Sequence, residues 1–168
     1  MDDDERLALA AELSRIEEDC IHSAKAQFNG AARLNGWHWT LGGSAAVLSA
    51  VVSASLIGNY PWVTGLLALL AAILTAVLTF IKPAERAANH QDAGNQYLAI
   101  RNEARRLRKL HLPNWSGLPA GTEFIEVLAG RHDDLNRSAI PPTQADFIKA
   151  RQGIEAGEAA YLVDKGSA

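Results

Sequence analysis

The sequence predicts an all-α integral membrane protein, with a two-helix membrane hairpin whose long helices extend into a cytoplasmic helical bundle. Asp, Glu, Lys and Arg are absent from residues 34–81 and frequent on both sides of that block. A charge-free run of 48 residues is too long for one buried helix. It matches two membrane crossings of ~20 residues each with a turn between them. No segment shows the alternation that is typical of a strand.

The charged N-terminal segment predicts an amphipathic helix over residues 5–36. Its apolar stripe has spacings of 4, 3 and 4 and consists of Leu9, Leu13, Ile16 and Cys20. No helix-breaking residue follows the stripe. We therefore expect this helix to continue into a first membrane helix at 39–57.

The charge-free block contains one helix-breaking segment, which predicts a turn at residues 58–61. Gly and Pro mark it, and Pro61 suits the start of a second membrane helix at 62–81. Pro83 follows that helix directly. Because an interior proline lacks an amide hydrogen and crowds the preceding turn, Pro83 is a candidate hinge that kinks the helix or restarts it.

The remaining chain predicts further cytoplasmic helices. The first covers residues 84–111, with a stripe formed by Ala93, Tyr97, Ile100, Ala104 and Leu107. Residues 112–121 contain two prolines and two glycines and predict a loop. C-terminal helices are expected over 122–163. One is expected at 123–137 with Thr122 as its N-cap, and another after Pro141-Pro142.

Small and hydroxylated residues follow one face of each predicted membrane helix. In the first helix they are Gly42, Ala46, Ser49 and Ser53, opposite Leu48 and Val51. In the second they are Thr64, Ala68, Ala71, Thr75 and Thr79, opposite Leu66, Leu70 and Ile73. Small residues let helices approach closely. The two faces therefore either pack against each other within one hairpin or support an oligomer in which they line a pore.

Positive charges near the membrane helices predict their orientation. Lys25, Arg33, Lys82 and Arg86 all flank the outer ends of the hairpin, and the turn carries no charge. The positive-inside rule then places both termini in the cytoplasm. The lipid bilayer is the first expected partner, and a second copy of the chain is the next.

The polar residues predict neither enzymatic chemistry nor a cofactor or metal site. Cys20 and His22 are two positions apart, so on a helix they face different directions. His132-Asp133-Asp134 lacks a second cluster with ligand spacing. The best polar candidate is a basic cluster for an anionic ligand, made of Arg101, Arg105 and Arg108. Nucleic acid is not an expected partner, because the sequence has no basic tail, and the net charge of −3 says little about partners.

Three segments give the chain a resemblance to a known family. They are residues 24–32, residues 80–90, which include Lys82-Pro83-Ala84-Glu85-Arg86, and residues 95–101. Together with the hairpin they resemble the SLATT domain, a bacterial membrane effector domain with two transmembrane helices. The resemblance covers about residues 9–160, so residues 1–168 are expected to form a single SLATT-like domain.

The resemblance implies a role in bacterial conflict, chiefly in defence against phage. Members are thought to oligomerise in the inner membrane and to form pores, or otherwise to breach the membrane, when a sensor triggers them. Growth arrest or cell death follows. Because this chain shows no fused sensor, the trigger is expected to be a separate sensor protein or a nucleotide. The alternative function is a non-conducting two-transmembrane scaffold that recruits a cytoplasmic partner.

Overall fold

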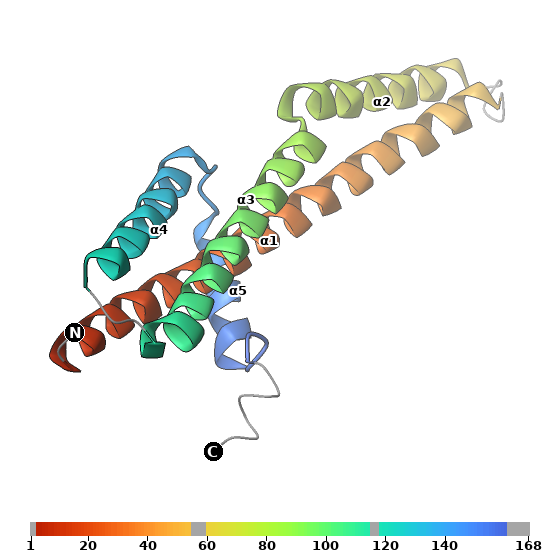
Figure 1. Cartoon of the computed structure of the whole chain (residues 1–168). Coiled ribbons are helices and arrows are strands. Elements are labelled where there is room, and N and C mark those ends of the chain that lie inside the picture. Colours follow the sequence, from red (N-terminus) through yellow and green to blue (C-terminus); the bar gives the residue numbers. More distant parts are fainter. Residues whose placement is uncertain (1–2, 55–59, 115–117, 161–168) are drawn as a thin grey trace. The chain divides into compact units, whose positions relative to one another are not determined.

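All the secondary structure that the computed structural model describes is helical (Figure 1). The description covers residues 3–54, 60–114 and 118–160, and no strand occurs within those ranges. The all-α prediction is therefore confirmed for this part of the chain. The chain divides into two compact units. The bundle unit comprises Met1–Gly30 with Asn89–Ala168, and the apolar unit comprises Ala31–Ala88.

Helix α1 runs from Asp3 to Ser53 without a break. It contains the helix expected at 5–36 and the described part of the membrane helix expected at 39–57. Three acidic residues occupy its first turn, where they complement the positive end of the helix dipole. The end of the expected membrane helix and the first half of the expected turn, residues 55–59, lie outside the described residues.

Helix α2 (Pro61–Ile81) coincides with the second membrane helix expected at 62–81. Tyr60 is its N-cap residue and Pro61 its first residue, where the missing amide hydrogen costs no helical hydrogen bond. The helical stretch that begins with α2 is the one in the described chain that is long and apolar enough to cross a bilayer. The described part of the first expected membrane helix, residues 39–54, is shorter than a full crossing and does not meet that criterion by itself, since residues 55–57 lie outside the described residues.

The joint after α2 is a helix break, so of the two alternatives expected at Pro83, a kink or a restart, the structure shows the restart. Lys82 has left-handed backbone angles, with φ 47° and ψ 54°, and its amide donates to the Leu78 carbonyl. Helix α3 (Pro83–Arg106) then starts afresh, with Pro83 as its first residue. The α-region is disfavoured for a residue that precedes proline, so a right-handed Lys82 would be strained.

The end of α3 and the start of α4 differ from the helix boundaries predicted from the sequence. The α-helix ends at Arg106, and a five-residue π-helix, Leu107–His111, replaces its expected last turn. A short 3₁₀-helix follows at Leu112–Asn114. Helix α4 (Leu118–Ser138) begins within the predicted 112–121 loop, so Thr122 lies inside the helix and is not its N-cap. Pro119, the second residue of α4, does not prevent this early start, because proline is tolerated in the first helical turn.

The last helix, α5 (Gln144–Glu155), is shorter than the range predicted up to residue 163. It starts after Pro141-Pro142 with a capping box. The Thr143 hydroxyl accepts a hydrogen bond from the Asp146 amide, and the Asp146 carboxylate accepts one from the Thr143 amide. The chain leaves the helix at Ala156, and Gly157 has a positive φ of 88°, which favours helix termination.

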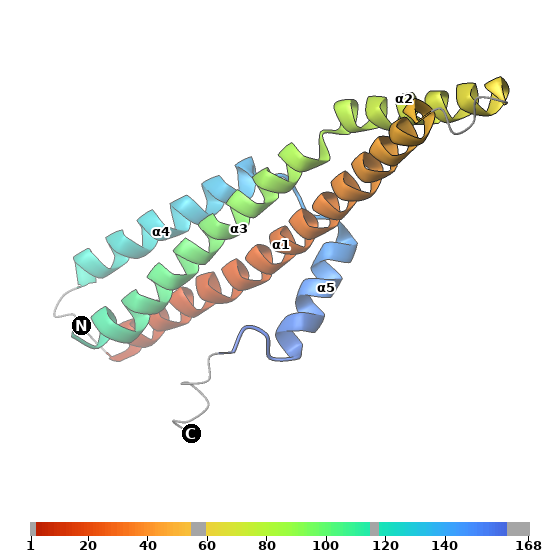
Figure 2. The ribbon, with the colours of Figure 1, turned by 90° about the vertical axis from the view of Figure 1, so that its right-hand side faces the viewer.

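The core of the bundle unit lies between α1, α3 and α4, which run side by side in Figure 2. Its buried side chains include the two stripes that the sequence predicts on α1 and α3. The α1 contribution is Leu13, Ile16, Cys20 and Ala24, and the α3 contribution is Ala93, Tyr97, Ile100 and Ala104. Helix α4 adds Ile125, Leu128 and Leu135. These spacings of three and four keep each apolar face on one side of its helix.

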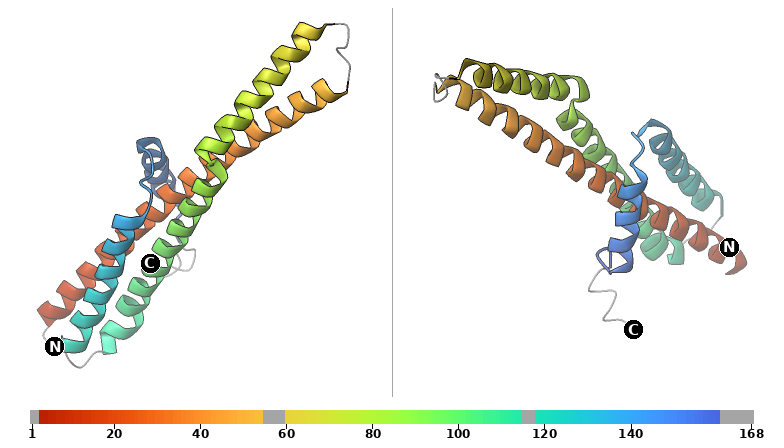
Figure 3. Two further views of the ribbon diagram at one scale, coloured as in Figure 1. Left: turned by 90° about the horizontal axis from the view of Figure 1, so that it is seen from above. Right: turned by 180° about the vertical axis from the view of Figure 1, so that it is seen from behind.

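In the apolar unit, α2 returns alongside the last part of α1 (Figure 3). Ala45 on α1 and Ala71 on α2 are buried. A Cβ atom placed on Gly42 would lie 3.6 Å from Leu78 Cδ1, which is ordinary van der Waals contact. Small residues thus allow the close approach of these two helices.

Candidate functional site

The candidate site with the largest share of the expected residues is a groove in the apolar unit. Its volume is about 680 Å³. The lining includes Ser49 and Ser53 from α1 and Ala68, Ala72, Thr75 and Thr79 from α2. Six of the nine small or hydroxylated residues expected on the two faces, all but Gly42, Ala46 and Thr64, therefore meet in one place.

The hydroxyl groups along this groove donate hydrogen bonds within their own helices. Ser49 donates to the Ala45 carbonyl at 2.9 Å and Ser53 to the Ser49 carbonyl at 2.8 Å. Thr75 and Thr79 do the same on α2, each at 2.9 Å. Each proton is thereby satisfied without water, as an apolar environment requires. The oxygen atoms of these hydroxyls keep acceptor capacity for a ligand or a neighbouring helix.

The face of α1 that packs in the apolar unit is rotated from the predicted one. Ala46 is exposed, whereas its neighbour Ala45 is buried. Leu48, which the sequence placed on the opposite face, is half-buried. The buried and half-buried positions of α1 recur at spacings of 4, 3 and 4, namely Leu41, Ala45, Leu48 and Val52. The small residues of the predicted face border them.

Helix α2 shows the same rotation and has three distinct faces. Half-buried or buried residues face α1 and recur at spacings of 4, 3 and 4, namely Leu67, Ala71, Leu74 and Leu78. A second face lines the groove. A third face, which we call the leucine ridge, is exposed and bulky and consists of Leu66, Leu69, Leu70 and Ile73. With 100° per residue, ridge and groove lie about 120° apart around the helix axis.

The basic cluster expected from the sequence does not form one site. Arg108 Nη2 lies 2.6 Å from Glu17 Oε2, so this guanidinium is paired with a carboxylate of α1. Arg101 Nη2 reaches the Ala159 carbonyl at 3.5 Å. Arg105 lines a different cavity, of about 380 Å³, together with Arg106 and Lys109. The three arginines of the cluster thus face different surroundings.

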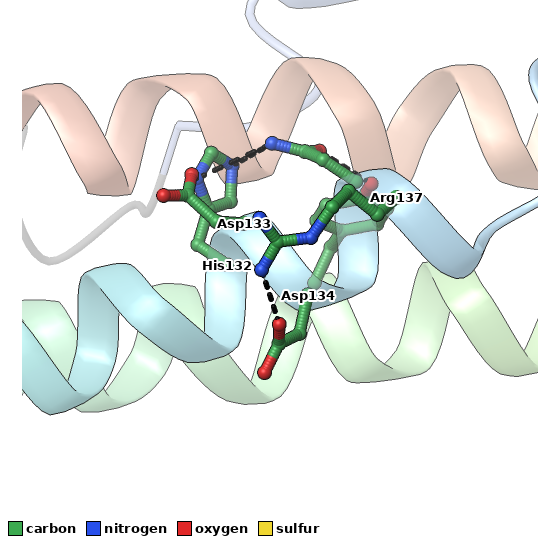
Figure 4. Close-up of polar contacts among 6 residues, drawn as sticks. His132, Asp133, Asp134 and Arg137 are labelled. Carbon is green, nitrogen blue, oxygen red and sulfur yellow. Dashed lines mark hydrogen bonds and ion pairs between the residues drawn. The ribbon is translucent and has the colours of Figure 1, made fainter.

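The His132-Asp133-Asp134 segment is occupied by contacts within the bundle unit (Figure 4). Asp134 pairs with Arg137 one turn later. His132 stands edge-on to the Tyr97 ring, with 6.0 Å between ring centroids, and its ring nitrogens lie 3.4 to 3.5 Å from Asn136 Nδ2. Among the residues that the structure describes, no three His, Cys, Asp or Glu side chains converge as metal ligands.

Cys20 lies in the core of the bundle unit and is fully buried. Burial, reinforced by the charge of Asp19 and opposed by Arg101, raises the pKa of this thiol from 9.0 to about 12. A nucleophilic cysteine needs a lowered pKa, since the thiolate is the reactive form. Cys20 is therefore a structural residue.

A buried polar cluster in the bundle unit was missed by the sequence analysis. It consists of Gln27 from α1, His90 from α3 and Asp146 from α5, whose exposed fractions are 2, 3 and 4%. Gln27 and His90 continue the apolar stripes of their helices, at spacings of three from Ala24 and Ala93. A polar residue at a position of an apolar stripe indicates a buried hydrogen bond. This pattern is the sequence signal that could have revealed the cluster.

Comparisons with protein-family models, with curated proteins and with solved structures gave no match. The SLATT resemblance therefore stays a prediction from the sequence.

Proposed function

We propose that this chain is a membrane effector that inserts through the apolar unit, assembles into a homo-oligomer and permeabilises the bacterial inner membrane when triggered. The observation that carries the proposal is the exposure of α2. Only 6% of its most apolar 18-residue stretch is buried, whereas the core helix of a soluble protein is mostly buried. The exposed leucine ridge favours contact with lipid or with another apolar helix.

Aromatic residues support insertion of both helices of the apolar unit. Trp39 on α1 is 70% exposed, and Trp62 and Phe80 on α2 are 71% and 89% exposed. Exposed aromatic rings near the ends of membrane helices are favoured at the level of the lipid headgroups. The less apolar span, at the end of α1, would enter the bilayer together with α2, because it packs against α2 and the hydroxyls of Ser49 and Ser53 donate their hydrogens within α1.

The arrangement of faces on α2 supports assembly into a ring. A groove of small side chains and the leucine ridge are complementary in shape, and they lie on different sides of the same helix. A ridge that enters the groove of the next copy makes a head-to-tail contact, which closes into a ring when the rotation allows it. The Ser and Thr oxygens near the groove would then lie close to the helix contacts, where small residues permit close approach.

The SLATT resemblance supports the effector role and adds the expectation of a trigger, either a separate sensor protein or a nucleotide. An enzymatic role has no support from a nucleophile–base or metal constellation in the described residues. A non-conducting scaffold remains the alternative, and leakage distinguishes the two functions.

The test is dye leakage from proteoliposomes that contain the full chain at increasing protein-to-lipid ratios. Leakage should rise steeply with the ratio, because assembly depends on concentration. Ala72→Leu fills the groove and should abolish leakage, whereas Ala46→Leu should leave it intact. Ala46 is exposed and does not line the groove, so Ala46→Leu is the matched control. High protein density replaces the trigger in this assay, because it drives assembly by mass action. If the chain inserts fully and the liposomes do not leak at any ratio, the chain is a scaffold.

A further inference from the structure

Helix α5 is attached to α1 chiefly through polar side chains. Gln27 Nε2 donates to the Ile140 carbonyl at 3.0 Å, in the segment that leads into α5. Asn29 Nδ2 donates to the Asp146 carbonyl at 3.1 Å, in the first turn of α5. A further ion pair joins Lys25 of α1 to Glu158 beyond the end of α5. Three positions of one α1 segment thus contact the chain at Ile140, Asp146 and Glu158.

The orientation of Gln27 requires a hydrogen on one ring nitrogen of its neighbour His90. The amide nitrogen of Gln27 donates to Ile140, so its oxygen faces His90 Nδ1, and that nitrogen must carry a hydrogen. One buried amide therefore connects α3 to the segment before α5. The fit is tight, since a Cβ on Gly30 would lie 3.3 Å from His90 Nδ1 and 3.5 Å from Asp146 Oδ2.

The apolar contribution of α5 is small by comparison. Its buried residues are Asp146 and Ala150. Two of its three large apolar side chains, Phe147 and Ile148, are 45% and 52% exposed, and the third, Ile154, is half-buried. Helix α4, in contrast, places Ile125, Leu128 and Leu135 in the core. Elements with few buried apolar contacts open at lower free energy than the core does.

We propose that residues 140–158 form a releasable arm and that its contacts with Lys25, Gln27 and Asn29 of α1 are its latch. Release of the arm breaks the two hydrogen bonds and the ion pair to α1 and leaves the core of α1, α3 and α4 folded. Release then exposes the polar side chains of Gln27 and Asn29 and the backbone of residues 140–146. This gives the bundle unit two states that a cytoplasmic signal can bias, and it does not depend on pore formation.

Hydrogen exchange of the full chain in lipid nanodiscs, followed by mass spectrometry, tests the latch. In the wild-type protein, amides of α5 should exchange before those of α4 residues 125–135. Gln27→Leu should speed exchange in α5 by about tenfold, the size expected from losing a buried hydrogen bond, with α4 unchanged. Asn29→Ala should act in the same direction and removes only one contact, so it serves if Gln27→Leu fails to fold.

The matched control is Asn136→Leu, which removes the acceptor of the Tyr97 hydroxyl between α3 and α4, at 2.7 Å in the wild-type protein. It should leave exchange in α5 unchanged. Equal protection of α5 and α4 in the wild-type protein would overturn the proposal. So would a uniform increase across α3, α4 and α5 in the Gln27 and Asn29 variants, because the cluster would then hold the whole bundle.

Discussion

At the scale of single residues, two helical glycines of the bundle unit have opposite surroundings. A Cβ on Gly94 would lie 2.6 Å from Cε1 of the Phe28 ring, whereas a Cβ on Gly130 would meet nothing within 4 Å. Gly94→Ala should therefore destabilise the bundle by about 1–3 kcal/mol through overpacking. Gly130→Ala should stabilise it by up to about 1 kcal/mol through helix propensity. Urea unfolding of both variants measures this, and shifts of the same sign would contradict it.

Cys20 gives a second prediction at this scale. Since burial raises its pKa to about 12, the thiol is neutral at pH 7 and should not react with iodoacetamide until the bundle unfolds. Leu7→Cys, at a position that is 68% exposed in the wild-type protein, is the control that should react at once. Rapid labelling of native Cys20 would contradict the assignment.

The same pKa shift predicts how stability depends on pH. The unfolded thiol ionises near its ordinary pKa of 9.0, and the folded thiol ionises only near 12. The stabilisation is therefore fully present below pH 9 and is lost as the pH rises towards 12. Cys20→Ala should remove this contribution to the loss of folding stability at alkaline pH. Unfolding midpoints of the two proteins between pH 8 and 11 provide the measurement.

At the scale of elements, the break between α2 and α3 depends on Lys82 and Pro83 together. Pro83 disfavours a right-handed Lys82, and proline inside a helix costs about 3 kcal/mol relative to alanine. Pro83→Ala should therefore allow α2 and α3 to fuse. Spin labels at Leu70→Cys and Arg86→Cys would report it, because 16 residues of continuous helix span about 24 Å. The wild-type distance should be shorter, and an unchanged distance in Pro83→Ala would show that Lys82 alone sets the break.

The helical faces illustrate what periodicity can and cannot predict. In the bundle unit, the stripes through Leu13 and Tyr97 were predicted and are buried, because charged residues mark the opposite faces. In the apolar unit no charge marks a face, so several stripes are equally regular. The stripe through Ala46 was predicted to pack, and the structure buries the one through Ala45. The packed stripe depends on helix rotation, which no local signal in this charge-free segment fixes.

At the scale of the whole molecule, the charge distribution predicts topology. Lys25, Arg33, Lys82 and Arg86 flank the apolar segments on the sides away from the turn. Both termini should therefore be cytoplasmic. In a Cys20→Ala background, a membrane-impermeant maleimide applied to intact cells should label Tyr60→Cys. It should not label Glu5→Cys or Glu155→Cys, and labelling of either of them from outside would reverse the topology.

The sequence by itself determined the helical class, the apolar stripes of α1 and α3, and the bounds of α2, because charge, periodicity and proline are local signals. Only the tertiary structure decided which residues meet across helices. It divided the Arg101–Arg105–Arg108 cluster, brought Ser49 and Thr75 to one groove, and joined Gln27 to His90 and to the segment before α5. These contacts join positions far apart in the chain. Their partners depend on helix rotation, which is set by the packing of side chains of different volume.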